Sequence, residues 1–432
     1  MAIKYTKVSI PVGEGQIEAA IPNLHGVIGP ARIPGVLDMR AEIRRAIRNP
    51  IESPRLKDIA RGKKDAGIIV NDITRPYPGR LLVEEIVSEL AEVGFRDEQI
   101  FLVVAYGNHR SNTETELRSV FGDNVVERFR IVHHKATDGT RLVTLGRTAG
   151  GVEVQINKDF AEAEVKIATG CITPHQLAGY SGGRKSIIPG IAGIKSLKNH
   201  HSFPIRPKVS SMGWLKGNPF HEESLAAAYI AGVDFIVNTV DNPERELVAC
   251  VAGELNAAHL KGVERCAEIW TVPVRAKVDV VVVSPGGYPR DFDLHQSQKA
   301  IGCAEMLCRE GGQIILVAEA RDGAGKLGKV LVEANDPDEI IDRFSQFGYS
   351  PDSISKAYMW ARAVKHFKVS VACSKVDKKE LANMFVESFA TVDEAVAAAL
   401  ERFGAEATFL VIPHASDITP IIGGEPVCQP AN

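Results

Sequence analysis

Reactive side chains are concentrated in residues 170–190 and in the histidine pair 200–201. Gly182 and Gly183 remove side chains next to Lys185, so a planar or phosphorylated group can approach the backbone there. A lysine so placed can act as a nucleophile or as the attachment point of a cofactor. The two imidazoles suit nickel, copper or zinc. These residues predict a cofactor site without naming the cofactor.

A second polar motif, Asn-Asp72-Ile-Thr-Arg75-Pro, follows an apolar run. Arg75 can bind a carboxylate or phosphate through two parallel hydrogen bonds. Asp72 can orient a neighbouring histidine or hydroxyl group. An Asx turn with a solvated arginine is the alternative interpretation.

His109, in Gly-Asn-His-Arg, also follows an apolar run. A histidine at the end of a strand has a pKa suited to proton transfer near neutrality, although a lone histidine is often structural. The pair His133 and His134 ends the next run and is equally suited to catalysis. The local pattern does not rank these histidines.

Gln296 and Lys299 lie three residues apart at the start of an expected helix, in Asp293-Leu-His-Gln-Ser-Gln-Lys. They share one helical face, and with the helix dipole they can bind an anion. A solvated first turn is the alternative.

The elements that position these residues have the pattern of α/β proteins. The first series is predicted as strand 66–72, helix 81–93, strand 100–105, helix 113–121 and strand 129–132. A second series begins near residue 276, with strands 278–284, 313–318, 368–372 and 408–412 and helices 294–309 and 392–403. We expect two α/β domains with mostly parallel sheets, residues 1–275 and 276–432. The cleft between them is the expected site.

Composition restricts the class of protein. A hydrophobic share of 45% is that of a soluble globular chain, and a net charge of -3 gives no footprint for nucleic acid or membranes. The seven cysteines form no CxxC pair, which favours reduced thiols in a cytoplasmic protein. We find no signal-peptide core and no apolar run of transmembrane length.

Taken in order, the motifs resemble the lactate racemase family, whose enzymes use a nickel-pincer nucleotide. The matching motifs are Asp72-Ile-Thr-Arg75-Pro, Gly-Asn-His109-Arg, Thr-Pro-His175-Gln, Ser-Gly-Gly-Arg-Lys185, Asn-His-His201 and Gln296-Ser-Gln-Lys299. Each motif is unspecific alone, but the ordered set extends over nearly the whole chain. The resemblance implies racemisation or epimerisation of a 2-hydroxy acid by reversible hydride transfer through a 2-keto acid.

The resemblance also implies the cofactor's position. Lys185 holds the pyridinium-3-thioamide-5-thiocarboxylic acid mononucleotide through a thioamide bond, and His201 is the protein ligand of its nickel. The spacing from Lys185 favours His201 over His200. Further residues on the cofactor's side are Asp72, Thr74, Gly182 and Gly183. Cofactor-maturation enzymes are the implied protein partners.

The remaining implied roles concern the substrate. His109 and His175 are the paired acid/base groups. The substrate is bound by Arg75, His295, Gln296, Lys299 and Trp360. The family has tyrosine where this chain has His295, so a polar pocket for malate or a sugar acid and an unchanged lactate pocket both remain open. Trp360 either covers this pocket or lies in the core.

Two rival interpretations remain. In the first, Lys185 forms a Schiff base, or the histidine pair binds zinc for hydrolysis, although no HExxH motif is present. In the second, the chain is a non-catalytic carrier or binding protein. A carrier requires only Lys185 and His201, so His109 and His175 argue against it.

Overall fold

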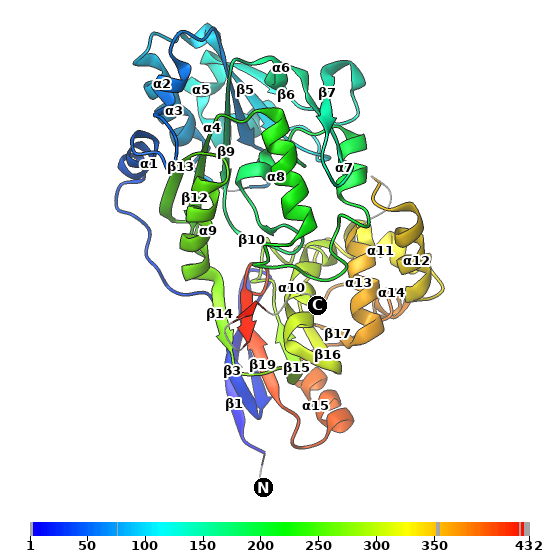
Figure 1. Ribbon diagram of the computed structural model, residues 1–432. Helices are drawn as coiled ribbons and strands as arrows, with labels where there is room; N and C mark the ends of the chain where they lie inside the picture. Colours follow the sequence, from blue (N-terminus) through cyan, green and yellow to red (C-terminus); the bar gives the residue numbers. More distant parts are fainter. Residues whose placement is uncertain (1–2, 76, 351–354, 423–424, 427–432) are drawn as a thin grey trace. The chain divides into compact units, whose positions relative to one another are not determined.

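The computed structural model describes residues 3–75, 77–350, 355–422 and 425–426. The chain divides into two compact α/β units (Figure 1). We call Arg32–Pro207 with Leu215–Ile269 the lysine unit, because it contains Lys185. Met1–Ala31, Lys208–Trp214 and Trp270–Asn432 make up the terminal unit.

This division differs from the predicted domains 1–275 and 276–432 at the N-terminus, at Lys208–Trp214 and by a few residues at the boundary, which lies at Ile269. Strand β3 (Leu24–Val27) pairs in parallel with β19 (Phe409–Ile412), so the first 31 residues belong with the C-terminal part of the chain. Alternating apolar residues predict that a strand forms but do not identify its partner, because that partner is nearly four hundred residues away.

A six-stranded sheet forms the centre of the lysine unit, in the order β13-β12-β9-β4-β5-β6. Its strands are β4 (Ala66–Asn71), β5 (Ile100–Ala105), β6 (Arg130–His133), β9 (Val165–Cys171), β12 (Phe235–Asp241) and β13 (Leu247–Gly253). All neighbours are parallel except β12 and β13. Parallel strands covered on both faces read as continuous apolar runs, and the five residues of β4 from Ala66 to Val70 are all buried.

Helices on one face of this sheet share its apolar core: α1 (Met39–Arg48), α2 (Leu56–Ala60), α3 (Gly79–Ala91) and α4 (Glu114–Phe121). Local sequence signals start them. The Asp38 side chain caps α1 by accepting from the Ala41 N–H, and Thr113 with Glu116 forms a capping box on α4.

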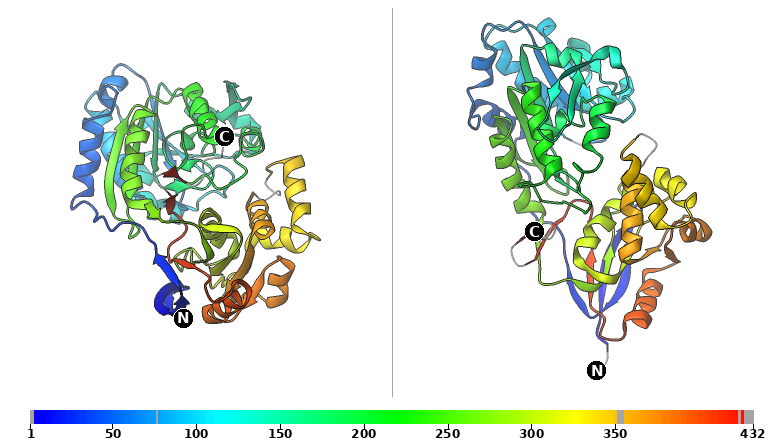
Figure 2. Two further views of the ribbon diagram at one scale, coloured as in Figure 1. Left: turned by 60° about the horizontal axis from the view of Figure 1, so that its bottom comes forward. Right: turned by 45° about the vertical axis from the view of Figure 1, so that its right-hand side comes forward.

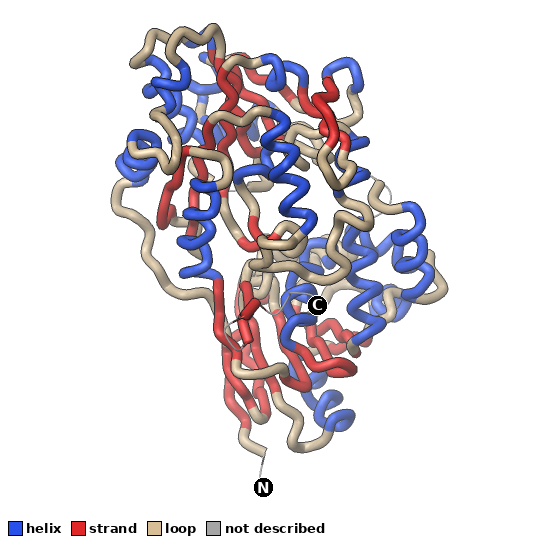
Figure 3. Tube along the Cα trace, in the orientation of Figure 1, coloured by secondary structure: helices blue, strands red, loops and turns tan. Residues whose placement is uncertain are grey.

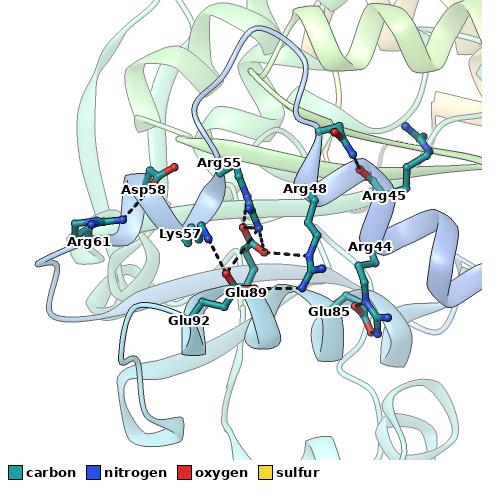
Figure 4. A network of polar contacts seen from close by, with 11 residues as sticks. Arg44, Arg45, Arg48, Arg55, Lys57, Asp58, Arg61, Glu85, Glu89 and Glu92 are labelled. Atoms are coloured by element: carbon teal, nitrogen blue, oxygen red, sulfur yellow. Dashed lines mark hydrogen bonds and ion pairs between the residues drawn. The ribbon is translucent and has the colours of Figure 1, made fainter.

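Charged side chains tie α1 and α2 to α3 (Figure 4). Arg44 of α1 bonds Glu85 of α3, and Arg55 bonds Glu89. Glu85 and Glu89 are buried, so their carboxylates require these partners. The network fixes the outer helices above the sheet.

The terminal unit contains a parallel sheet in the order β18-β17-β16-β15-β19-β3. Its further strands are β15 (Val278–Val283), β16 (Cys308–Val317), β17 (Lys368–Ala372) and β18 (Glu387–Phe389). Successive residues of β15 face opposite cores: Val281 and Val283 pack into one cluster, and Val280 and Val282 into another. Both faces are therefore covered.

Helices α10 (Leu294–Leu307) and α13 (Ser355–His366) contribute to the first of these clusters. The second is formed with α15 (Val392–Phe403) and the hairpin of β1 (Tyr5–Val12) and β2 (Gly15–Pro22). Figure 2 shows the blue N-terminal strands beside the red C-terminal ones, and Figure 3 marks them as strands.

Further elements complete the two units. The helices are α5 (Asp123–Arg128), α6 (Lys158–Glu162), α7 (Ile194–His200), α8 (Pro219–Ala231), α9 (Ala257–Trp270), α11 (Gly325–Val332), α12 (Pro337–Phe347) and α14 (Lys378–Asn383). The strands include β7 (Leu142–Arg147), β8 (Glu153–Asn157), β14 (Thr271–Val274) and β20 (Thr419–Ile422). Across the described ranges, no helix combines the length and apolar character needed to cross a membrane.

Candidate active site

Three neighbouring strands of the lysine unit end at the loops that carry the candidate residues. Asp72 follows β4, His109 lies four residues after β5, and His175 lies four residues after β9. The registers Asn71↔Ala105 and Ile69↔Ala168 align these ends. Because the carboxyl ends of parallel strands share one edge of a sheet, the three loops emerge on the same side.

The Asp72 side chain organises the loop after β4. Its Oδ1 accepts from the Thr74 N–H at 3.1 Å and the Thr74 hydroxyl at 2.6 Å, while Oδ2 lies 2.7 Å from His109 Nδ1. Burial acts to raise the pKa of Asp72, but the bonds to His109 and Thr74 outweigh it and lower the pKa. Asp72 therefore does both things that the sequence suggested as alternatives: one oxygen forms a local turn, and the other contacts a histidine.

An ionised Asp72 fixes the proton of His109. A carboxylate only accepts, so Nδ1 carries a hydrogen, and in the neutral form of the ring the lone pair is on Nε2. The His109 side chain is 51% exposed. This arrangement presents a proton-accepting nitrogen to solvent, with a buried negative charge behind it.

Lys185 lies in a short 3-10 helix, η3 (Gly183–Ser186), whose first and last residues are hydrogen-bonded to strands of the sheet. Ser186 Oγ donates to the Thr169 carbonyl of β9, and the Gly183 N–H donates to Asn238 Oδ1 of β12. Burial, and then the charges of Arg184 and Arg75, hold the pKa of Lys185 well below its usual value. Its Nζ lies 3.4 Å from His175 Nε2.

Gly182 and Gly183, which the sequence predicts to let a ligand approach the backbone, also have a structural role. A Cβ on Gly182 would lie 2.7 Å from Ile172 Cγ1, and one on Gly183 would lie 3.0 Å from His259 Cδ2. Their φ angles of +77° and +52° also favour glycine. Packing and backbone conformation thus both require glycine at these two positions, because protein atoms lie where a side chain would begin.

His200 and His201 differ in which nitrogen can bind a metal. His200 is buried, and its Nε2 lies 2.9 Å from the Phe220 carbonyl oxygen, so Nε2 carries the hydrogen and Nδ1 is an acceptor. His201 Nδ1, 3.4 Å away from that acceptor, then carries its hydrogen, which leaves the lone pair on Nε2. Burial and the neighbouring His200 hold the pKa of His201 well below its usual value, so the ring is neutral.

Comparisons with known proteins agree with this geometry. The lactate racemase N-terminal domain model matches residues 12–213, and the lactate racemase C-terminal domain model matches residues 274–419. The chain belongs to the lactate racemase family. A curated lactate racemase from Thermoanaerobacterium thermosaccharolyticum is 33% identical over 94% of this chain and 97% of that protein. One from Lactiplantibacillus plantarum is 36% identical over 87% of this chain and 90% of that protein.

Solved structures give the same assignment. The lactate racemase apoprotein from Thermoanaerobacterium thermosaccharolyticum superimposes with a TM-score of 0.86 at 32% identity, covering 96% of this chain and all of that chain. A Thermotoga maritima protein at 16% identity, with a TM-score of 0.63 over 89% of this chain and 98% of that chain, shares the fold alone. As a member of the lactate racemase family, this chain is an isomerase of the racemase class.

In this racemase-family chain, the other predicted ligand-binding residues lie in the terminal unit. The Asp293 side chain caps α10 by accepting from the Gln296 N–H at 2.6 Å. Lys356 of α13 donates to the His295 carbonyl at 2.5 Å and lies 3.4 Å from Gln296 Oε1. Lys299 is partly buried one turn further along α10. No sequence pattern points to Lys356, because it lies sixty residues from the motif it contacts.

Trp360 lies in the core rather than over a pocket. It is 0% exposed within the apolar cluster of the terminal unit, and its indole N–H donates to the Met384 carbonyl at 3.0 Å. With its polar atom already bonded and no exposed edge, this side chain has no surface to offer a ligand. Of the two alternatives for Trp360, the core one is correct.

His133 and His134 are used within the fold. His133 Nδ1 lies 2.9 Å from the Tyr106 hydroxyl, and the two rings stack. His134 Nε2 lies 3.0 Å from the Ala192 carbonyl, and burial lowers the pKa of His134 to about 4. The geometry thus separates these two from His109, which the sequence pattern did not.

Arg75 extends from the loop after β4 with an exposed side chain, and its guanidinium contacts the Thr74 hydroxyl at 3.2 Å. A second arginine, Arg184, received no role from the sequence pattern, yet it is 1% exposed and bonds backbone carbonyls. Within the described part of the chain, no group of three or more His, Cys, Asp and Glu side chains is arranged to hold a metal ion.

Proposed function

We propose that this chain racemises lactate or a related 2-hydroxy acid, using a nickel-pincer nucleotide attached to Lys185. One observation carries the proposal. A carboxylate-backed histidine with an Nε2 lone pair follows β5, and a lysine with a strongly lowered pKa follows β9; these strands flank β4, so both groups emerge at the same carboxyl-end edge of a single sheet. Acid/base chemistry and covalent attachment require these two groups respectively.

The residues fit the proposed cofactor. An amine must be unprotonated to form a thioamide bond, and the environment of Lys185 favours that state. A metal-binding histidine must be neutral and usually donates its other N–H to a neighbour, as His201 does to His200. Lys185 therefore holds the nucleotide and His201 binds its nickel. When bound, the nickel-pincer nucleotide supplies a hydride acceptor.

The protein's own residues handle the proton and the charge. His109 Nε2 takes the hydroxyl proton of the substrate, and Asp72 stabilises the imidazolium that results. Arg75 binds the substrate carboxylate. Removal of hydride and proton would leave a planar 2-keto acid, and after that acid rotates in the site, hydride would return to its opposite face and give the opposite enantiomer. His175 is the proposed partner of His109 for that enantiomer.

In the terminal unit, the start of α10 offers further anion-binding groups. Lys356 lies on the Oε1 side of Gln296, which leaves the Nε2 amide hydrogens to donate elsewhere. Burial lowers the pKa of His295 to about 3, so its imidazole is neutral. We propose that Gln296, Lys299 and His295 bind substrate, and that the polar His295 extends the range toward malate or a sugar acid. We also propose a cytoplasmic location, where cofactor-maturation enzymes act on the chain.

Intact-protein mass and nickel content, measured on chain co-produced with cofactor-biosynthesis enzymes, test the proposal. An adduct that maps to Lys185 with one nickel per chain, together with exchange of lactate enantiomers, is the expected result. An unmodified, nickel-free chain under those conditions would overturn it.

An uncharged lysine also suits a Schiff base, so a second arm separates the two chemistries. Borohydride added with pyruvate would reduce and trap a Schiff base on Lys185 of the metal-free chain. We expect no trapping. Trapping at this residue would replace the pincer proposal with Schiff-base chemistry.

A further inference from the structure

The imidazole of His175 is held by its own backbone. Its Nδ1 accepts from the N–H groups of Leu177 at 3.1 Å and Ala178 at 3.2 Å. A neutral imidazole has one acceptor nitrogen and one N–H group. With Nδ1 committed as the acceptor, the hydrogen is on Nε2.

That assignment determines the state of Lys185. Nε2 of His175 lies 3.4 Å from Lys185 Nζ, and an ammonium group has no lone pair with which to accept a hydrogen bond. The contact is a hydrogen bond only if Lys185 is an uncharged amine. Burial and the charge of Arg184 act in the same direction on the pKa of Lys185.

Arg184 holds this arrangement in place from the interior. Its Nη2 donates to the carbonyls of Ala178 and Tyr180, each at 2.8 Å, and its Nη1 lies 2.7 Å from His259 Nε2. The guanidinium is almost fully buried. It therefore fixes the backbone turn that orients His175 and places a positive charge next to Lys185.

We propose that His175 is held as its Nε2–H tautomer and, before the cofactor is attached, acts as a hydrogen-bond donor that keeps the Lys185 amine uncharged. His109 has the opposite proton arrangement, with Nδ1–H on Asp72 and a lone pair on Nε2. His175 is thus a positioning residue for attachment, an inference that rests on the proposed function. An amide-type nitrogen does not accept hydrogen bonds, so attachment removes Lys185 as an acceptor for His175, and the acid/base role proposed for His175 in the loaded enzyme then requires its Nε2 to exchange that hydrogen for a lone pair.

The direct test is the tautomer of each histidine in the full, metal-free chain. Long-range proton–nitrogen NMR correlations of protein labelled with [15N]histidine at pH 8 distinguish the two neutral forms. Spectra of His175→Gln and His109→Gln assign the signals. We expect Nε2–H for His175 and Nδ1–H for His109. The same tautomer in both residues, or Nδ1–H in His175, would overturn the proposal.

A matched pair of variants tests the effect on Lys185. His175→Gln places an amide N–H near the position of Nε2, whereas His175→Asn keeps an acceptor near the position of Nδ1 and loses the donor. The readout is the pH midpoint of Lys185 acetylation by acetic anhydride, followed by peptide mass spectrometry, with the exposed Lys195 as internal reference. A neutral hydrogen bond predicts a midpoint raised by about half to one pH unit in the Asn variant and little changed in the Gln variant.

The other titratable groups that act on Lys185 are present in both variants: Arg75, Arg184, His200 and His201. An unchanged midpoint in His175→Asn, or an equal shift in His175→Gln, would contradict the role of the donor. Neither experiment needs nickel. If both give the expected result but no adduct forms, the proposed function fails and the hydrogen bond stands. If a Lys185 adduct forms but His175 has its hydrogen on Nδ1, the proposed function stands and the hydrogen bond proposed here is wrong.

Discussion

The side chains of Asp72 and Asp138 form the same kind of local turn, but in the described contacts only Asp72 also bonds a histidine, His109. In each, Oδ1 accepts from the hydroxyl of the threonine two residues later at 2.6 Å, and from its N–H at 3.1 Å or 3.2 Å. The second oxygen of Asp72 bonds His109 at 2.7 Å, whereas Asp138 is a half-buried residue before a short 3-10 helix. The chain thus contains an internal control for the role of the carboxylate.

Asp72→Asn is expected to keep the turn and lose the charge that stabilises the His109 imidazolium. We predict that kcat of the cofactor-loaded enzyme falls by about 10²-fold, at the lower end of typical acid/base contributions, with KM changed much less. Asp138→Asn should leave both constants unchanged. Equal activities of the two variants would show that the Asp72 charge plays no part in catalysis.

Lys185→Met should abolish attachment of the nucleotide. The variant replaces a half-buried amine with an apolar chain of similar length, so we expect a melting temperature equal to or above that of the parent. Lys195→Met alters an exposed lysine in α7 and should be loaded normally. Intact mass after co-production measures both, and an adduct of unchanged mass on Lys185→Met would place the attachment elsewhere.

The histidine pair should separate into one nickel ligand and one structural residue. His201→Ala is expected to lose nickel while it stays folded. His200→Gln retains a donor for the Phe220 carbonyl and should keep most of the metal. Nickel content by elemental analysis and melting curves test this, and retention of nickel by His201→Ala together with its loss in His200→Gln would reverse the assignment.

Arg75→Ala should weaken substrate binding. A charge-assisted hydrogen bond contributes about 1.5 to 3 kcal/mol, so we predict that KM rises by about 10-fold or more. Arg61→Ala removes an exposed arginine that pairs only with its neighbour Asp58 in the described contacts, and serves as the control. Saturation of Arg75→Ala at the parental substrate concentration would assign the carboxylate to other residues.

Glu85 should contribute to stability in a pH-dependent way. Burial acts to raise the pKa of Glu85, but Arg44 and Arg40 outweigh it and lower the pKa below 4.5. A depressed folded-state pKa gives stability that is present above the unfolded pKa and is lost as the pH falls through the folded value. Both arginines are more than a third exposed, so solvent screening reduces the effect.

Glu85→Ala is therefore expected to lower the free energy of unfolding by about 1 to 2 kcal/mol at pH 7 and by less at pH 3. The exposed Glu98, paired with Arg96, is the matched control, and its replacement should cost about 0.5 kcal/mol or less. Denaturant unfolding at both pH values measures the difference. A loss that grows toward acid pH would mean that the folded protein raises the pKa of Glu85 instead of lowering it.

The elements of this chain could be predicted more closely than their partners. The predicted strand 100–105 and helix 392–403 coincide with β5 and α15, because their apolar period and capping residues are local signals. The pairing of β3 with β19 depends on a contact across most of the chain, and no local pattern encodes it. For the same reason, the residues next to Trp360 in the sequence could not show whether its side chain lies in the core or over a pocket.

The candidate site shows the same limit. The order of the motifs led to the family, and the strand ends correctly grouped Asp72 with His109. The proton positions on His175 and His201 depend on backbone and side-chain partners that become apparent only in three dimensions. Residue types therefore indicated which side chains are candidates for chemistry, while the hydrogen-bond partners determine which nitrogen of each histidine carries the hydrogen.

The pairing of β3 with β19 has a consequence for biogenesis. About 380 residues separate Val27 from Phe409, so at a ribosomal rate of about 5 to 20 residues per second the first strands wait roughly 20 to 75 s for their partner. During that time Ile10 and Ile21, which are fully buried in the finished protein, lack the sheet that covers them. The first two strands of the nascent chain therefore expose apolar side chains until the strands of the terminal-unit sheet have been made.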